Sequence, residues 1–208
     1  MNKTYLRKVI LLFPAVLLLA CGISLCTSAG LGADLHTSFL QGIGRQIHLS
    51  PGTMTLLFNL LLLFIYFFAQ RSWIGPGSLL IGFCLGPFMN LFESIFYAGI
   101  ITLALPLRIL IDIFGIFLIS LALSFYIPLN VGLQPLDMLK QTMANTLKLT
   151  YGNATNLYSV IALAGTLLFG GDVGIGSILT LLLCGKMCDL LLPHTQRLIE
   201  KLNSEKTS

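Results

Sequence analysis

Charged and amide side chains within long apolar runs are the residues of this 208-residue chain whose types could do chemistry. Asn90 and Glu93 are three residues apart, and so are Lys186 and Asp189. This spacing places each pair on one face of a helix. Polar groups are expensive in apolar segments that cross a membrane, and there they often mark solute or ion pathways. The two pairs are therefore candidates for lining such a path.

Two further polar positions have the same character. Asp112 lies in an apolar run, with Arg108 four residues before it. Asn59 lies in another run, and Ser159 occupies the matching position in the second half of the chain. Transporters often place their substrate sites near the middle of the membrane, between two repeats. The substrate-path candidates are Asn59, Asn90, Glu93, Asp112, Lys186 and Asp189.

A structural interpretation of the same residues stays open beside the functional one. Lys186 with Asp189, and Arg108 with Asp112, would each be a neutralising ion pair. Asn90 and Glu93 would lie near the end of a span, close to water. In that case none of these side chains would contact a solute.

Enzyme motifs are missing from the sequence. It contains no P-loop, zinc-ligand spacing, nucleophile elbow or paired catalytic carboxylates, and the glycines of "GGDVGIG" link two apolar runs instead of following a soluble strand. Cys184 and Cys188 share a helix face, so a metal or redox site is an alternative to their interpretation as small packing residues. We expect no enzymatic activity, no catalytic residues, no cofactor and no metal.

The composition indicates a membrane protein. Hydrophobic residues make up 56% of the chain and charged residues 10%, and the mean hydropathy is +0.90. Soluble domains carry about 25% charged residues, so this chain has too few to cover a surface in water. The net charge of +4 is not gathered into a basic patch with aromatics, which argues against nucleic acid and for a lipid bilayer as the main partner.

The apolar runs predict an all-α, polytopic fold with six transmembrane helices. Each run approaches the roughly 20 residues that a span needs. More polar stretches after the first and fourth runs have apolar residues at helical spacing, and each predicts a short amphipathic helix. The start of the chain resembles a lipoprotein signal but is interpreted as the first span. The predicted spans are 9–26, 54–70, 77–97, 109–127, 154–170 and 175–192.

Two segments of the chain are similar in sequence: "IGPGSLLIGFCLGPFMNLF", which starts at Ile74, and "VGIGSILTLLLCGKMCDLL", which starts at Val173. "HLSPGTMTLLF" and "KLTYGNATNLY" also correspond, as do Gly30-Leu31 and Gly132-Leu133. We expect glycines in these segments to allow tight turns and close helix packing. The structural glycines are Gly75, Gly77, Gly82, Gly86, Gly174, Gly176 and Gly185.

Three spans per half require the second half to enter the membrane the opposite way up. The predicted units are two inverted repeats, residues 1–98 and 99–194, followed by a cytoplasmic tail, residues 195–208. With both termini in the cytoplasm, only Arg45 and Arg108 lie outside and Lys186 lies within a span, as the positive-inside rule expects. The basic residues on the inner side are Lys3, Arg7, Lys8, Arg71, Lys140, Lys148, Arg197, Lys201 and Lys206.

The quoted segments, with "AGLGADLHTSFLQGI" and "NVGLQPLDMLKQTM", resemble the YczE/YyaS/YitT-type bacterial integral membrane proteins, and the YczE branch most. The Gly-x-Gly-Ser turns are intact. A Pro-Trp-Asp element after the first span of each half takes the forms Ala33-Asp34-Leu35 and Pro135-Leu136-Asp137, without tryptophan. The resemblance implies a bacterial plasma (inner) membrane protein and assigns no binding residue.

The sequence favours a transporter or permease for a small polar or ionic solute, in which two inverted halves rock around a central site. A homodimer would thicken the wall around the pathway. The alternative is a membrane-embedded substrate-binding or accessory subunit of a multi-component system, with no transport activity of its own.

Overall fold

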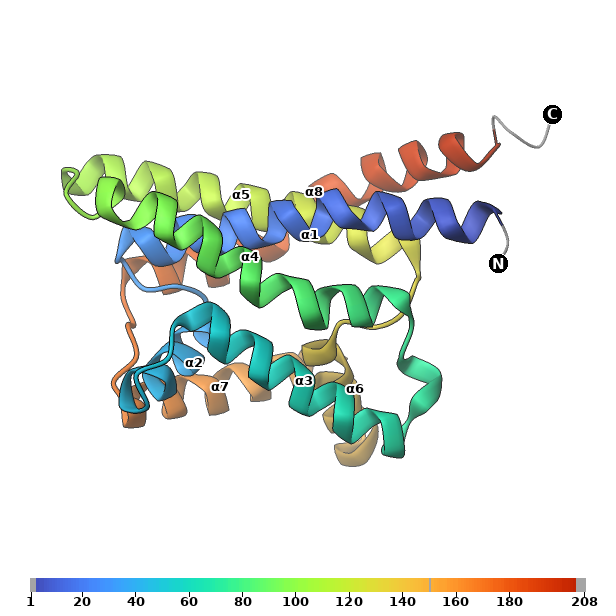
Figure 1. Ribbon diagram of the computed structural model, residues 1–208, viewed down its shortest axis with the longest axis horizontal. Helices are drawn as coiled ribbons and strands as arrows, with labels where there is room; N and C mark the ends of the chain where they lie inside the picture. The colour runs from blue at the N-terminus through green and yellow to red at the C-terminus, as the bar shows by residue number, and fades with distance from the viewer. Residues whose placement is uncertain (1–2, 150, 205–208) are drawn as a thin grey trace.

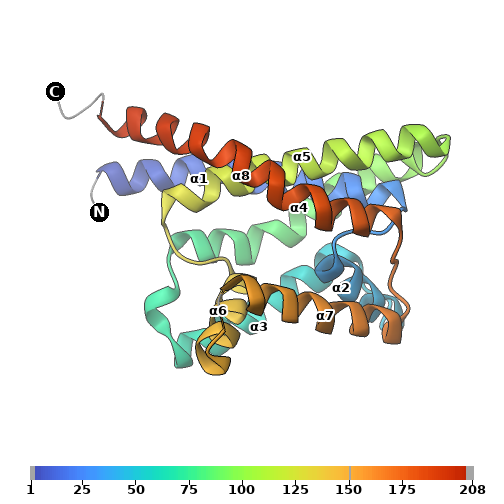
Figure 2. The ribbon, with the colours of Figure 1, turned by 180° about the vertical axis from the view of Figure 1, so that it is seen from behind.

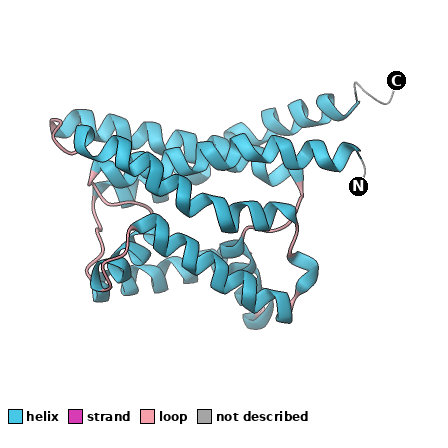
Figure 3. Ribbon diagram, viewed as in Figure 1, coloured by secondary structure: helices cyan, strands magenta, loops and turns pink. Residues whose placement is uncertain are grey.

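The computed structural model describes residues 3–149 and 151–204, and within these ranges every regular element is a helix (Figure 3). The all-α prediction is confirmed. The helices are α1 (Lys3–Ala29), α2 (Leu35–Gln46), α3 (Pro51–Ala69), the 3₁₀ turn η1 (Arg71–Trp73), α4 (Pro76–Ile100), α5 (Leu105–Leu129), α6 (Pro135–Leu147), α7 (Tyr151–Phe169) and α8 (Ile175–Ser204). The two short amphipathic helices predicted from the sequence are α2 and α6.

Local sequence signals explain where several helices begin. Asp34 caps α2, because its carboxylate accepts hydrogen bonds from the backbone N–H groups of His36 and Thr37. The Ser50 hydroxyl caps α3 in the same way by accepting from the Thr53 N–H. Proline in the first turn, which needs no N–H donor there, opens α3, α4, α5 and α6.

The helices form two layers (Figure 1). In one layer α1 packs against α4 and α5, and α5 packs against α8. In the other layer α2 packs against α3 and α7, and α6 also packs against α3 and α7. Helix α4 slants between the layers, because it contacts α3 as well as α1. Figure 2 shows the same two layers from behind.

Four helices are long and apolar enough to cross a membrane: α1 from Lys8 onward, α3, α4 and α5. A fifth span results if the two parts of α8, Ile175–Cys188 and Leu190–Ile199, which meet at a 41° bend, are one crossing. The apolar part of α7, Asn153–Phe169, is shorter. The structure therefore supports four or five of the six expected spans, and the sixth stays a prediction.

Large apolar side chains face outward over these helices. Examples are Phe68 (73% exposed), Leu110 (62%) and Leu168 (81%). Contiguous apolar surface on this scale is rare in soluble monomers, whereas it matches the hydrocarbon interior of a bilayer. The outer surface thus agrees with the composition in indicating a membrane location.

Among the backbone hydrogen bonds that join the first part of the chain to the second, two are donated by the first turns of long helices. The N–H of Gly77, in the first turn of α4, donates to the carbonyl oxygen of Val131 at 2.9 Å. The N–H of Gly176, in the first turn of α8, donates to the carbonyl oxygen of Leu31, also at 2.9 Å. We call these two junctions the clamps. Val131 accepts the hydrogen bond in the first clamp, as Leu31 does in the second. The sequence match of Gly30-Leu31 with Gly132-Leu133 had instead aligned Leu31 with Leu133.

Glycine is needed where the clamps close. A Cβ atom on Gly75 would collide with the Val131 carbonyl, and one on Gly174 would collide with the Leu31 carbonyl. Gly32 and Gly132, in the loops that receive these helix starts, have φ of +89° and +119°, which side-chain-bearing residues rarely adopt. The repeated Gly-x-Gly-Ser phrase therefore has a structural explanation at both of its sites.

The other predicted structural glycines divide into two groups. A Cβ on Gly82 would meet Leu63, and one on Gly86 would meet the Gly52 carbonyl, so both glycines allow α4 to approach α3 closely. For Gly185, no neighbouring atom of the described residues lies within 4 Å of an added Cβ, so a packing role at this position stays a prediction. Gly185 lines the central cavity, which is described in the next subsection.

Gly75→Ala and Gly174→Ala should each destabilise the protein, by roughly 1–3 kcal/mol, because the added methyl group forces a clamp apart. Thermal unfolding in detergent measures this as a lower melting temperature. The matched control is Gly99→Ala, whose methyl group would meet no neighbouring atom within 4 Å in the part of the chain that the structure describes. Melting temperatures for both clamp variants equal to that of the control would contradict the assigned role.

Candidate functional site

A cavity of about 470 Å³ lies between the two layers, with walls from α1 through α8. A second hollow of about 240 Å³ adjoins it and shares Asp34, His36, Lys140 and Thr180 with it. Cavities of this size hold small molecules. The wall formed by α1, α4 and α5 is apolar, with Leu19, Ile119 and Met89 among its residues. The wall formed by α2, α3, α6 and α7 is mostly polar.

The N-terminal ends of α2 and α6 meet at this cavity. Asp34, the N-cap of α2, and Gln134, the N-cap of α6, both line it. In Figures 1 and 2 the two helices diverge from the middle of the molecule. Helix N-termini carry partial positive charge and unsatisfied N–H donors, so two of them create a polar centre inside an apolar protein.

Charged side chains of both signs stand at this centre. Lys140 lies 3.3 Å from Asp137 in an ion pair within α6, and both residues line the cavity. The Asp34 carboxylate accepts hydrogen bonds from the first turn of α2 and from the Thr37 hydroxyl. Two carboxylates, one ammonium group and two helix ends therefore face a single space.

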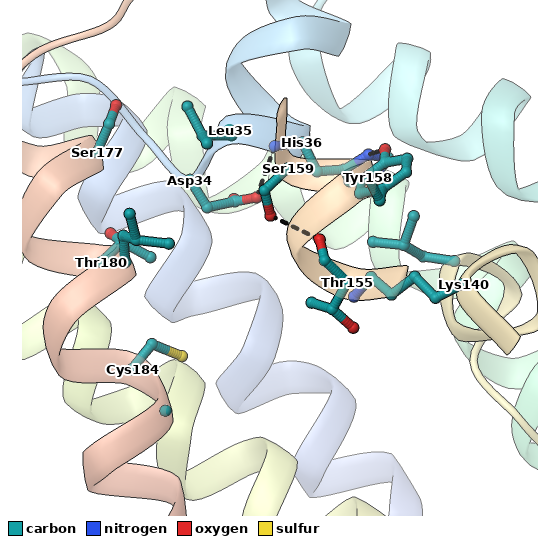
Figure 4. Close-up of a pocket in the computed structure, with 13 residues that line it drawn as sticks. Asp34, Leu35, His36, Lys140, Thr155, Tyr158, Ser159, Ser177, Thr180 and Cys184 are labelled. Atoms are coloured by element: carbon teal, nitrogen blue, oxygen red, sulfur yellow. Dashed lines mark hydrogen bonds between the residues drawn. The ribbon is translucent and has the colours of Figure 1, made fainter. Parts of the chain in front are cut away.

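His36 and Tyr158 close one side of the smaller hollow (Figure 4). The His36 Nδ1 and the Tyr158 hydroxyl are within hydrogen-bond distance and join α2 to α7. Burial lowers the pKa of His36 to about 4, although Asp34 opposes this shift. His36 is thus neutral at pH 7 and adds hydrogen-bonding capacity but no charge.

Several buried polar atoms of the lining have no partner within the described part of the chain. They are Asn59 Nδ2, Thr155 Oγ1 and Thr180 Oγ1. Burying such an atom unsatisfied costs about 1–3 kcal/mol, so these atoms are available to bind a ligand or water. Asn59 was expected to lie on the substrate path, and it lines the cavity.

Asn90 and Glu93 lie elsewhere, in a separate hollow near the start of α3. Asn90 accepts a hydrogen bond from the Ser50 hydroxyl at 2.7 Å and donates one to the Thr53 hydroxyl at 3.0 Å. It therefore fastens α4 to the beginning of α3. The structure separates this pair from the cavity and favours a structural role for Asn90.

The expected ion pair of Arg108 with Asp112 does not form. Arg108 donates instead to the carbonyl oxygens of Ala29 and Gly30, at 2.7 and 3.0 Å, and so caps the end of α1. Asp112 is fully buried on α5 and does not line the central cavity.

The last predicted pair lies on α8. Lys186 is exposed and does not line the cavity. The side chain of Asp189 lies outside the described residues. The neighbouring positions Cys184, Gly185 and Cys188 do line the cavity, so α8 faces it, while a role for Asp189 on the path stays a prediction.

Comparisons with known proteins identify the family. A family model described as a family of unknown function, DUF6198, matches residues 6–193. The chain belongs to this family. The uncharacterized protein YyaS of Bacillus subtilis (strain 168) is 26% identical over 182 residues, which are 88% of this chain and 90% of YyaS. The uncharacterized membrane protein YczE of the same organism is 23% identical over 202 residues, 94% of this chain and 90% of YczE. No solved structure matches the chain.

The expected resemblance to YczE and YyaS is thus confirmed, and it holds the signal for residues that charge spacing missed. Asp34 and Asp137 are the aspartates of the Pro-Trp-Asp-like elements, and both line the cavity. They were passed over because they fall in short polar segments instead of apolar runs. His36 and Lys140 lie in the same segments and were missed for the same reason.

Native cysteines provide a test of the cavity. Cys184 lines both parts of it, whereas Cys26 is 1% exposed and packed between α1 and α5. A small water-soluble methanethiosulfonate should modify Cys184 at least tenfold faster than Cys26 in the folded protein, as measured by peptide mass spectrometry. Equal rates in the native protein would contradict a water-accessible cavity. The unfolded protein, in which both thiols react, is the control.

Proposed function

We propose that this protein is a transporter for a small polar or ionic solute, built from two inverted three-span repeats around the central cavity. The observation that carries the proposal is the meeting of α2 and α6, one from each half, at a cavity with unpartnered polar atoms. Transporters place substrate between repeats, against the N-terminal ends of short or broken helices. On this proposal the protein is not an enzyme.

Matching contacts within the halves support the repeat. The Ser24 hydroxyl on α1 donates to the Met89 carbonyl of α4 at 3.0 Å. The Ser124 hydroxyl on α5 donates to the Cys188 carbonyl of α8 at 3.4 Å. The two clamps are a second matched pair, this time between halves. Corresponding helices run in opposite directions in Figure 1: α1 opposes α5, and α4 opposes α8.

The same picture supports the proposed placement in the membrane. Both ends of the chain lie at one end of the molecule (Figure 1), as an even number of crossings requires. The excess of Lys and Arg on that side supports a cytoplasmic location for both termini, and the family resemblance supports a bacterial plasma membrane as the location of the protein. The exposed apolar faces would contact lipid and a second copy in a homodimer.

The lining suggests how a solute would be held. Asp34 would attract a positive group, and the Asp137–Lys140 pair could open to bind a charge of either sign. The free Asn59 amide N–H would donate to a solute oxygen, and the threonine hydroxyls could donate or accept. A volume of about 470 Å³ accommodates a molecule of amino-acid or sugar size and leaves room for water.

The test begins with solute binding. Purified protein is heated in detergent with panels of amino acids, amines, sugars, organic acids and inorganic ions, and stabilisation identifies ligands. Each ligand is then offered in labelled form to proteoliposomes. We expect uptake by the wild-type protein and at least a tenfold loss in Asn59→Leu, which removes an unpartnered donor without breaking a hydrogen bond within the described structure.

The matched control is Glu93→Gln, a polar substitution on α4 outside the central cavity, which should transport normally. A solute that binds at Asn59 but is never taken up would overturn transport and support the binding-subunit alternative. If no solute stabilises the protein, or if Asn59→Leu binds and transports normally, the cavity is not the site.

A further inference from the structure

Asp112 is a buried acid that does not line the central cavity. Its side chain is fully buried on α5, and neither carboxylate oxygen has a hydrogen-bond partner within the described residues. The Cys26 thiol on α1 donates to the backbone carbonyl oxygen of Asp112 at 3.5 Å and is also the polar side chain that interacts with the carboxyl group, as a weak donor. Arg108, one turn earlier on α5, is bound to carbonyls at the end of α1.

The carboxylate faces the start of α8. Asp112 Oδ2 lies 3.1 Å from the position that a Cβ on Gly176 would occupy, and Gly176 is the residue that donates to Leu31 in the second clamp. The first turns of α8, "IGSILT", bring no titratable group to it. The titratable groups near the carboxyl are the Cys26 thiol from α1, which is at most a weak hydrogen-bond donor, and Arg108 from its own helix, which is bound to backbone carbonyls instead.

The fold does not need an acid at this place. In the first clamp, Leu12 Cδ2 lies 3.2 Å from the corresponding Cβ position on Gly77. Leu12 on α1 and Asp112 on α5 thus occupy matching places beside the two clamps, and both are fully buried. A leucine fills one place without polar atoms, so the aspartate at the other place calls for a functional explanation.

We propose that Asp112 is a proton-binding site, loaded and emptied when the clamp between α8 and Leu31 opens. An unpaired carboxylate in apolar surroundings is very costly, whereas the protonated carboxyl is neutral. The positive end of α8 beside it lowers the cost of the anion during exchange. Only one O–H bond forms or breaks, and the proton comes from water and returns to water.

A proton fits this site better than a metal cation. Hard cations collect six or more oxygen ligands. Within the described residues no group of three or more His, Cys, Asp or Glu side chains could hold a metal ion. A single carboxyl group can bind a proton by itself, but its two oxygens are too few ligands to hold a sodium ion.

The site is linked to the cavity through one residue. Ser177, next to Gly176, donates from its hydroxyl to the Ala33 carbonyl at 2.6 Å, and it also lines the smaller hollow. Ala33 directly precedes Asp34, the cap of α2. Any movement of the α8 start that admits water to Asp112 therefore pulls on the end of α2 at the cavity. This coupling of proton to solute rests on the proposed transport function.

Infrared spectroscopy of the full-length protein in lipid nanodiscs tests the proton site without any solute. We expect the carbonyl band of a protonated carboxylic acid at neutral pH, absent from Asp112→Asn and from Asp112→Leu, and retained in Asp137→Asn. The leucine variant should stay folded, because Leu12 fills the matching place. No band assignable to Asp112 at any pH at which the protein is folded would overturn the proposal. So would a band that disappears when sodium is added at constant pH.

The coupling is tested with a solute that the binding screen identifies. Its affinity should change with pH in the wild-type protein and lose that dependence in Asp112→Asn. An unchanged pH dependence in the variant would overturn the coupling. Failure of the transport proposal, in which no solute binds, is distinguishable because the infrared band reports on Asp112 independently.

Discussion

The architecture depends on two backbone hydrogen bonds, from Gly77 to Val131 and from Gly176 to Leu31. Each fastens the beginning of a long helix to the loop that leaves a helix of the other half. Because these contacts are between main-chain atoms and are closed by glycines, they leave no room for a side chain at Gly75 or Gly174. The halves are thus interlocked instead of merely adjacent, and a displacement of either long helix must act on the opposite loop.

The interlock also determines where the polar groups lie. The loops held at Leu31 and Val131 run directly into α2 and α6, so the same contacts hold both N-terminal ends at the central cavity. Long helices supply an apolar outer surface for lipid, while the short helices bring Asp34, Asp137 and Lys140 into the interior. Polar backbone at this depth is tolerated because it lines a cavity within the protein.

The sequence predicted the helical class, the membrane setting, the two amphipathic segments and the role of the Gly-x-Gly-Ser turns, because these follow from composition, hydropathy and backbone sterics. It predicted the site less well. The search for charged and amide side chains inside apolar runs selected Asn90, which joins α4 to the start of α3, and Asp112, which lies beside a clamp. It also selected Asn59, which lines the cavity, and a role for Asn59 on a substrate path stays a prediction. Asp34 and Asp137 lie in the elements that carry the family resemblance, but their convergence at one cavity depends on how α2 and α6 pack, which is a tertiary property that no local pattern encodes.

The central claim, that two inverted halves surround the cavity, is tested most directly by the membrane side of the two Gly turns. Single cysteines replace Ser72 and Val173 in a protein without its native cysteines, and intact cells are treated with an impermeant thiol reagent. Val173 is exposed, and its substitution leaves the neighbouring Arg45–Asp172 ion pair in place. If the halves are inverted, the cysteine at Val173 is labelled from outside and the one at Ser72 is labelled only after the membrane is opened. Labelling of both from the same side would mean that the halves are parallel, and it would rule out the inverted arrangement.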